Sequence, residues 1–311
     1  MKRNPLPIEP AHGHHLRDDL PLIAAQLERR RALAWLGSTA GAALLAACGG
    51  GESSSTGSVL SALGSSTETV AAAASTDTTA STSTSTSTTS SAACTADPQE
   101  TAGPFPADGT NTSAGATSDV LTASGVVRSD IRPSFITSAT IAQGVPMTLQ
   151  LTLVDTNSSC TPLAGYAIYI WHCDAAGNYS LYGSAAAESY LRGVQVTDGA
   201  GQVNFTTIFP ACYSGRWPHI HFEVFKTVAA ATTGRNASLT SQLAMPAAAC
   251  STVFNGASAY SRSVANFASV SLSSDMVFSD NSAAQIAAMT PTVTGSVAGG
   301  YAATGTIGIA V

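Results

Sequence analysis

Hydrophobic and polar residues alternate along much of the second half of the chain, as expected of β-strands with one face packed on a core. Apolar residues fill every second position of 147–153, between threonines and a glutamine. Residues 166–171 (YAIYIW) form a β-branched and aromatic run, and residues 219–225 (HIHFEVF) alternate again. Residues 194–205 predict two strands around a turn that contains Asp-Gly, and the C-terminal 306–311 (TIGIAV) predicts one more strand.

Helical periodicity is scarce, and short strands separated by turn signals favour an all-β fold. We therefore predict an antiparallel β-sandwich with long loops and little helix. Residues 49–93 are rich in Ser, Thr and Gly and cannot bury enough apolar surface to offset chain entropy, so we expect a disordered linker there. The folded domain is then expected over 94–311, which is long enough for one good core.

The N-terminus has the features of an export signal. Arg29–Arg31 precede an apolar run of 16 residues, 32–47, with small residues before its end at Cys48. The paired arginines make 1–48 similar to a twin-arginine signal, and residues 45–48 are similar to a bacterial lipobox, whose cysteine is acylated. These patterns predict an exported, periplasmic or cell-envelope lipoprotein. A non-lipidated signal peptide cut nearby is the alternative.

Beyond Cys48 the chain has five cysteines, which an oxidising compartment would tend to pair. We favour the pairs Cys94–Cys160 and Cys212–Cys250, with Cys173 unpaired because it lies within an apolar strand pattern. The alternative is that all five are buried thiols.

Charge excludes one class of partner. Only 10% of residues are charged, with a net charge of −6, and the two lysines are Lys2 and Lys226. A nucleic-acid-binding protein needs a basic face to neutralise phosphates, so we expect no nucleic-acid partner. Membrane contact is expected only through a lipid at Cys48, and a homo-oligomer is compatible with the sequence.

His219 and His221 are the first candidates for chemistry. In an extended strand alternate side chains share a face, so both histidines point to one side, with Glu223, while the apolar residues between them face the core. Two imidazoles at this spacing can both reach a single ion. The alternative is a pair of surface or core-edge histidines.

Two tyrosines and an arginine strengthen the metal hypothesis. Tyr213 lies six residues before His219, with Arg216 between them, and Tyr179 follows an Ala-Gly-Asn turn after the strand that ends at Trp171. Phenolates are hard anionic ligands that suit ferric iron. Taken singly, each tyrosine is more typical of packing, and the arginine of a surface ion pair.

Four segments together resemble, in the same order, motifs of the intradiol ring-cleavage dioxygenases, the family of protocatechuate and catechol dioxygenases. They are ETAGPFP (100–106), WHCDAAGNY (171–179), CYSGRWPHIHF (212–222) and TSQL (240–243). The resemblance covers 94–311 and implies the β-sandwich core of that family. The spacing from the second tyrosine to the first histidine is shorter than in the best-known members, which indicates a divergent exported branch.

The resemblance also implies the site. Tyr179, Tyr213, His219 and His221 would be ligands of one non-haem Fe(III) per chain. Around them would stand the pocket residues Thr101, Gly103, Pro104, Arg216 and Gln242.

The implied reaction is cleavage of the aromatic ring of a catechol with O2 to a muconate-type diacid. Tyr213 would leave the metal and act as a base when the catechol binds, and Arg216 would stabilise developing charge. Two alternatives stay open: a metal- or ligand-binding β-sandwich lipoprotein without turnover, and a zinc or copper site built on the two histidines.

Overall fold

A computed structural model describes residues 94–311 of the chain. The predicted export signal of 1–48, the lipobox cysteine Cys48 and the linker of 49–93 lie outside the described residues, so those interpretations stay predictions.

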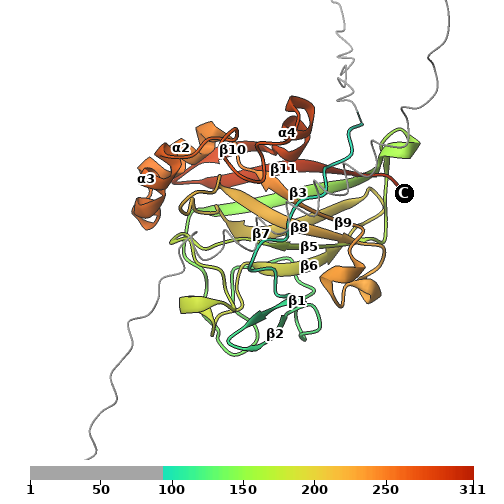
Figure 1. Ribbon diagram of the computed structural model, residues 1–311, viewed down its shortest axis with the longest axis horizontal. Helices are drawn as coiled ribbons and strands as arrows, with labels where there is room; N and C mark the ends of the chain where they lie inside the picture. The colour runs from blue at the N-terminus through green and yellow to red at the C-terminus, as the bar shows by residue number, and fades with distance from the viewer. Residues whose placement is uncertain (1–93) are drawn as a thin grey trace, which may run out of the picture. The chain divides into compact units, whose positions relative to one another are not determined.

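Two β-sheets form the body of the described domain (Figure 1). The first contains β10 (Thr292–Ser296), β11 (Gly300–Ile309), β3 (Pro146–Asp155), β4 (Thr161–Pro162) and β7 (Gln202–Ile208). The second has the order β6 (Arg192–Val196), β5 (Ala167–Trp171), β8 (His219–Phe225), β9 (Leu239–Ala244). A separate ribbon pairs β1 (Asp108–Ser113) with β2 (Ala116–Asp119). The 3-10 turns are η1 (Thr156–Ser158), η2 (Gly183–Ala185), η3 (Val228–Ala230), η4 (Gly234–Asn236) and η5 (Ser258–Tyr260).

The all-β prediction is confirmed, and alternation explains the first sheet. In β3 the apolar Met147, Leu149 and Leu151 are buried, while the polar residues between them are partly or fully exposed. The second sheet differs, because β5 and β8 are buried along their whole length. A loop covers its outer face: the Tyr169 hydroxyl of β5 donates to the carbonyl oxygen of Pro106 at 2.8 Å. The histidine side of β8 is therefore enclosed rather than open to solvent.

Two features of the topology differ from a simple antiparallel sandwich. The strands expected within 194–205 form as β6 and β7, but β6 pairs with β5 and β7 pairs with β3, so their turn carries the chain from one sheet to the other. The C-terminal strand β11 runs parallel to β3, from Tyr301 beside Met147 to Ile309 beside Asp155. A parallel pair requires a long crossover connection, and here most of the described domain separates the two strands.

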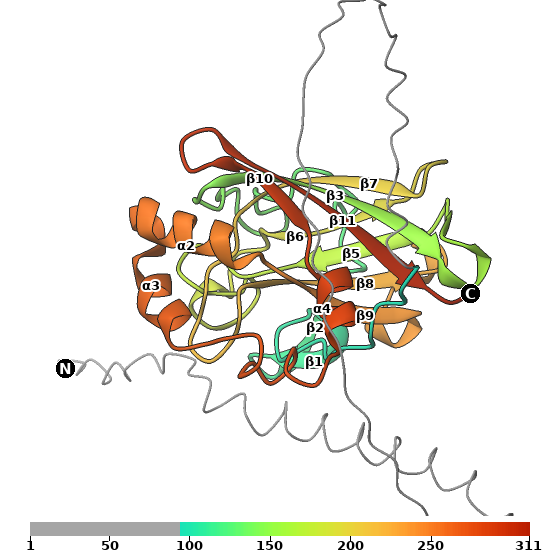
Figure 2. The same cartoon turned by 90° about the horizontal axis from the view of Figure 1, so that it is seen from above.

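Three helices occupy a segment in which the sequence suggested little helix: α2 (Ala247–Gly256), α3 (Ser261–Ala268) and α4 (Ala283–Met289). On α2 the buried residues Cys250, Val253 and Phe254 have helical spacing, but the element is too short for the pattern to stand out. In Figures 1 and 2 α2 and α3 lie together to one side of the sheets, while α4 lies against β11 and β9. None of the helices within 94–311 has the length and apolar character that a membrane span needs.

The cysteine predictions are confirmed in part. Cys94 and Cys160 form a disulfide, and Cys173 is a buried free thiol, as expected. The predicted Cys212–Cys250 pair is wrong, because both residues are buried free thiols. Cys212 directs its Sγ to the carbonyl oxygen of Arg216 at 3.4 Å, whereas Cys250 faces the core from α2.

Candidate metal centre

β8 brings the two histidines of the HIHFEVF stretch together. Because alternate residues of an extended strand share a face, His219 and His221 point the same way, and their Nε2 atoms are 3.1 Å apart. The strand lies between β5 and β9, with Trp171 on one side of His221 and Gln242 on the other. Both imidazoles are almost completely buried.

Two loops bring the tyrosines to the same place. Tyr179 follows a turn in which the Asp174 carboxylate accepts the backbone N–H of Asn178 at 2.9 Å. Gly177 within this turn has φ +89°, and a Cβ there would lie 3.2 Å from the Cβ of Tyr213. A glycine therefore satisfies both the turn and the close approach of the two tyrosine loops.

The four residues meet around one atom. His219 Nε2 lies 3.1 Å from the Tyr179 hydroxyl oxygen, 3.3 Å from that of Tyr213 and 3.1 Å from His221 Nε2. Tyr179 is buried and Tyr213 is half-buried. All four residues that the sequence suggested as metal ligands thus converge in the folded chain.

A hydrogen bond fixes the tautomer of His219. Its Nδ1 lies 2.5 Å from the carbonyl oxygen of Trp217. A carbonyl only accepts hydrogen bonds, so Nδ1 carries the proton and the lone pair of Nε2 faces the two tyrosines. Metal-binding histidines are commonly oriented in this way.

Burial keeps every one of these groups neutral near pH 7 when no cation is bound. Burial raises the pKa of Tyr213 to about 12, although the charge of Arg216 opposes the rise. Burial and the neighbouring Tyr213 raise the pKa of Tyr179 well above its usual range. Burial and Arg216 lower the pKa of His219 to about 3, and burial and His219 lower that of His221 well below its ordinary value.

Arg216 connects the site to three other parts of the chain. It is fully buried; its Nη2 donates to Oε1 of Gln242 at 2.7 Å, and its Nε donates to the Asp275 carboxylate at 2.9 Å. Gln242 in turn donates from Nε2 to the carbonyl oxygen of Thr101 at 2.9 Å. These contacts bring together Arg216, Gln242 and Thr101, which the sequence had placed in one pocket.

The loop of residues 100–106 lies against the histidines. Gly103 has φ +69°, and a Cβ at this position would stand 3.3 Å from Cε1 of His221, so a larger residue would press on that ring. The backbone N–H of Gly103 donates to Oγ1 of Thr101 at 3.0 Å. Pro104 is held from outside the loop, because the side-chain amide of Asn111 on β1 donates to its carbonyl oxygen.

Sequence reasoning missed Arg192, which links the loop of residues 100–106 to the loop of Tyr179 by hydrogen bonds. The buried guanidinium donates from Nη2 to the carbonyl oxygens of Phe105 and Ser180, at 2.9 and 2.8 Å, and from Nη1 to that of Pro106 at 2.9 Å. The Phe105 ring lies 5.2 Å from that of Tyr179. In the sequence, Arg192 is only an arginine at the start of an apolar strand, and this pattern is too weak to assign it a role.

Asp275 was also missed, since it lies far along the chain from every motif. His172, which lies beside Trp171, has both ring nitrogens engaged: Nε2 contacts Thr207 Oγ1 at 2.7 Å and Nδ1 contacts the carbonyl oxygen of Cys173 at 2.9 Å.

The cluster of Tyr179, Tyr213, His219 and His221 has too few hydrogen-bond acceptors for its close contacts, which indicates that it fits a cation. The single lone pair of His219 Nε2 faces three neighbours within 3.3 Å, and it cannot serve all three well. Donor atoms bound to one ion at about 2.0–2.2 Å stand about 3 Å apart, which is the spacing found here. Within 94–311 no group of three or more His, Cys, Asp or Glu residues is arranged to hold a metal, so an ion at this site would need the phenols as well.

Comparisons with known proteins agree with this fold. Residues 132–247 match the family model described as Dioxygenase. The chain is similar to the structure of an intradiol ring-cleavage dioxygenase from Tetranychus urticae, with 23% identity over 70% of this chain and 95% of that chain and a TM-score of 0.51, which shows a shared fold.

Two other solved structures are less similar to the chain. The dioxygenase domain of a carbohydrate-binding fusion protein from Streptomyces sp. SirexAA-E has 22% identity over 70% of this chain and 99% of that chain, with a TM-score of 0.41. Catechol 1,2-dioxygenase from Acinetobacter sp. ADP1 has 17% identity over 69% of this chain and 63% of that chain, with a TM-score of 0.41. No curated protein sequence matches the chain.

Proposed function

We propose that the chain is an intradiol dioxygenase, a non-haem Fe(III)-dependent enzyme that cleaves the ring of a catechol with O2; the match of residues 132–247 to the Dioxygenase family model and the fold shared with an intradiol ring-cleavage dioxygenase support this proposal. The product would be a muconate-type diacid. One observation carries the proposal: the phenol oxygens of Tyr179 and Tyr213 and Nε2 of His221 all lie within 3.3 Å of Nε2 of His219. Two phenols beside two imidazoles form a donor set suited to ferric iron.

The residues that would hold the ion are Tyr179, Tyr213, His219 and His221. When bound, ferric iron would supply a Lewis-acid centre at which a catechol and O2 react. Both phenols must lose their protons on binding, and two phenolates would offset much of the +3 charge in a buried site. Two neutral histidines complete the set without adding charge, in agreement with their lowered pKa values.

Tyr213 is the better candidate for the proton acceptor. It is half-buried, whereas Tyr179 is buried, so an incoming substrate reaches Tyr213 more easily. A phenol whose pKa is about 12 leaves a phenolate basic enough to take a proton from a catechol hydroxyl. In this role Tyr213 would hold that proton at its hydroxyl oxygen while the substrate occupies the site.

Arg216 would serve the later steps as a fixed cation. Its guanidinium is buried and oriented by Gln242 and Asp275, so little reorganisation is needed as negative charge develops on the substrate oxygens. In the overall reaction the bond between the two oxygen-bearing ring carbons breaks, and each of these carbons gains one oxygen atom from O2. The atoms and electrons balance without an external reductant.

The export proposal rests on the sequence of residues 1–48 alone. We infer that the enzyme acts in the periplasm or cell envelope, with membrane contact through a lipid on Cys48.

Oxygen uptake with a panel of catechols tests the enzymatic proposal. The iron-loaded full chain is expected to consume one O2 per catechol and form a diacid. Tyr213→Phe should lose most of this activity, whereas Tyr166→Phe, a change at a partly buried tyrosine of the 163–166 loop, should keep it. Bound iron with no consumption of catechol or O2 would favour a binding protein without turnover.

A further inference from the structure

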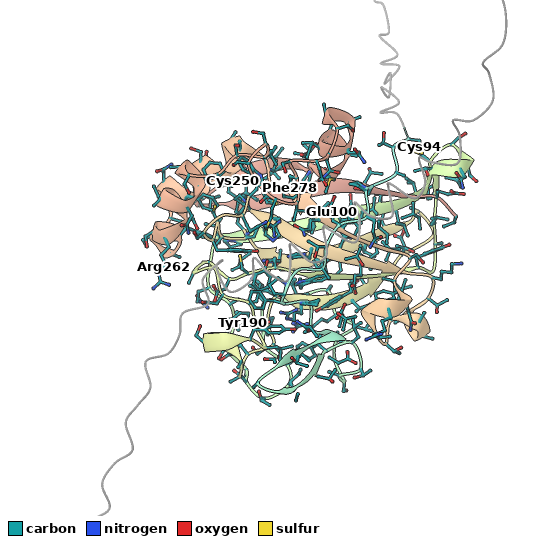
Figure 3. The ribbon with its side chains drawn as sticks, in the orientation of Figure 1. Cys94, Glu100, Tyr190, Cys250, Arg262 and Phe278 are labelled. Carbon is teal, nitrogen blue, oxygen red and sulfur yellow. A yellow bond between two sulfur atoms is a disulfide. The ribbon has the colours of Figure 1, made fainter. Side chains whose placement is uncertain are left out.

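The segment 247–289 follows the region that the family model matches and reaches back to the candidate metal centre. It builds its own small hydrophobic cluster around Trp217, with Phe278 and Met289 buried and the ring of Phe267 5.0 Å from the indole. Phe278 and Cys250 are labelled among these helices in Figure 3, with Glu100 nearby. The segment is therefore packed firmly and can hold a polar residue in a fixed position.

Asp275 is the polar residue that this cluster holds. It is completely buried, and its two oxygens accept four hydrogen bonds. Oδ2 accepts from Arg216 Nε at 2.9 Å and from the backbone N–H of Trp217 at 2.6 Å. Oδ1 accepts from the backbone N–H groups of Val277 at 2.8 Å and Phe278 at 3.1 Å.

This arrangement requires a carboxylate. An asparagine has one acceptor oxygen and one NH2 group, so either Arg216 and Trp217 or the backbone of 277–278 would face a donor instead of an acceptor. Burial alone would raise the pKa of Asp275, but the charge of Arg216 and the N–H donors outweigh it and hold the pKa below its ordinary value. Asp275 is therefore ionised and forms a buried ion pair with Arg216.

Asp275 also reaches the histidine side of the site. The Trp217 peptide N–H that it accepts belongs to the residue whose carbonyl oxygen accepts the Nδ1 proton of His219. A second tether comes from the same segment, because Asn281 Nδ2 donates to Oε1 of Glu100 at 3.1 Å, next to Thr101. The segment thus supports both chain stretches that flank the cluster of tyrosines and histidines.

We propose that Asp275 is a positioning residue, supplied by the segment 247–289, that holds the Arg216 guanidinium against Gln242 and beside the metal centre. The expected effect of Asp275 on turnover rests on the proposed function, whereas its role in orienting Arg216 does not. One measurement tests the orientation of Arg216, and a second tests the effect on turnover.

The first measurement needs neither iron nor turnover. Hydrogen exchange of the Arg216 Nε–H is followed by nitrogen-15 NMR in the metal-free full chain, with Arg216→Lys to assign the signal. Wild type and Asp280→Asn, a change at an exposed aspartate five residues away, should show slow exchange. Asp275→Asn should exchange at least about 10-fold faster, because the negative charge and one of the two acceptor oxygens are lost. Unchanged protection in Asp275→Asn would overturn the proposal.

The second measurement is steady-state kinetics of the iron-loaded chain. Asp275→Asn should lower kcat about 10- to 100-fold, as expected for a misplaced charged group, while KM changes less than about threefold. Asp280→Asn should match wild type. In an Arg216→Gln background Asp275→Asn should add less than about a twofold loss, because the two residues act as a unit.

An equally large loss in that background would overturn the proposal. If Asp275→Asn alone does not fold, recovery of a folded protein in the double variant Asp275→Asn/Arg216→Gln supports the pairing, because no unpaired buried charge remains. Failure of both variants to fold would contradict it. If wild type consumes no catechol, the proposed function fails, while the exchange of the Arg216 Nε–H still decides the positioning role.

Discussion

The imidazole of His221 lies flat on the indole of Trp171, with ring centroids 4.7 Å apart and the planes 5° apart. Among the described residues Nδ1 of His221 has no hydrogen-bond partner, unlike Nδ1 of His219. Stacking on Trp171 therefore orients this ring, and Gly103 leaves room for it, because a Cβ there would stand 3.3 Å from Cε1 of His221. The ring of Tyr169 also stacks on Trp171, with ring centroids 4.9 Å apart.

Replacing Trp171 separates the effect of stacking from that of general packing. Trp171→Leu should weaken iron binding about 10-fold, in the range found when a group that orients a metal ligand is lost. Trp171→Phe keeps an aromatic face and removes an indole N–H that has no partner in 94–311, so it should bind iron nearly as well as wild type. Competition with a chelator measures both affinities. Equal affinity of wild type and Trp171→Leu would contradict this account of His221.

Tyr179→Phe removes one proposed ligand and little else. The phenylalanine keeps the contact with the Phe105 ring, so the protein should stay folded. The visible charge-transfer band of the iron-loaded chain and the activity should both fall by most of their value. Tyr301→Phe, a change at a buried tyrosine of β11, is the matched control and should keep both. A spectrum unaltered by Tyr179→Phe would remove Tyr179 from the ligand set.

The β8 stretch shows how far sequence alone reaches. Its period-two pattern predicts both the strand and the shared face of His219 and His221, because those properties depend on neighbouring residues. Tyr179, Tyr213, Arg216 and Gln242 come from other loops and strands, so the pattern alone could not bring them together. The family resemblance supplied those residues, and the fold brings them to one place.

Other features could not be predicted, since they depend on long-range packing. Asp275 accepts from the backbone N–H of Trp217, 58 residues earlier in the chain, and Arg192 donates to the carbonyl oxygen of Phe105, 87 residues earlier. The turn between β6 and β7 has local signals for a hairpin, but β6 pairs with β5 and β7 pairs with β3, in different sheets. The three helices of 247–289 are too short for their periodicity to be distinguished from loops.

Asp97 should make stability depend on pH. Burial raises its pKa to about 7 from an ordinary 3.8, although the N–H of Gly308 donates to its carboxyl group and opposes the rise. Because the pKa of Asp97 is higher in the folded than in the unfolded chain, its protonated carboxyl group favours the folded state. This contribution to stability is fully present below about pH 4 and is lost as pH rises through about 7. Asp97→Asn should therefore gain stability relative to wild type between pH 4.5 and 8, by at most about 4 kcal/mol. Urea unfolding at several pH values measures this, and a pH-independent difference would contradict it.

The Cys94–Cys160 disulfide should stabilise the domain without affecting the site. It joins residues 66 positions apart, for which chain-entropy arguments give about 4 kcal/mol. Thermal unfolding of Cys94→Ser/Cys160→Ser should occur at a lower temperature than that of wild type, and a reductant should have no further effect on the variant. The visible spectrum of the iron-loaded variant should not change. Equal melting temperatures of reduced and oxidised wild type would contradict this prediction.

We propose that Tyr179, Tyr213, His219 and His221 hold one ferric ion. The most direct test combines metal analysis of the purified full chain with its visible spectrum. We predict about one iron per chain and a reddish colour from tyrosinate-to-iron charge transfer. A colourless zinc protein or a blue copper protein without this band would contradict the claim.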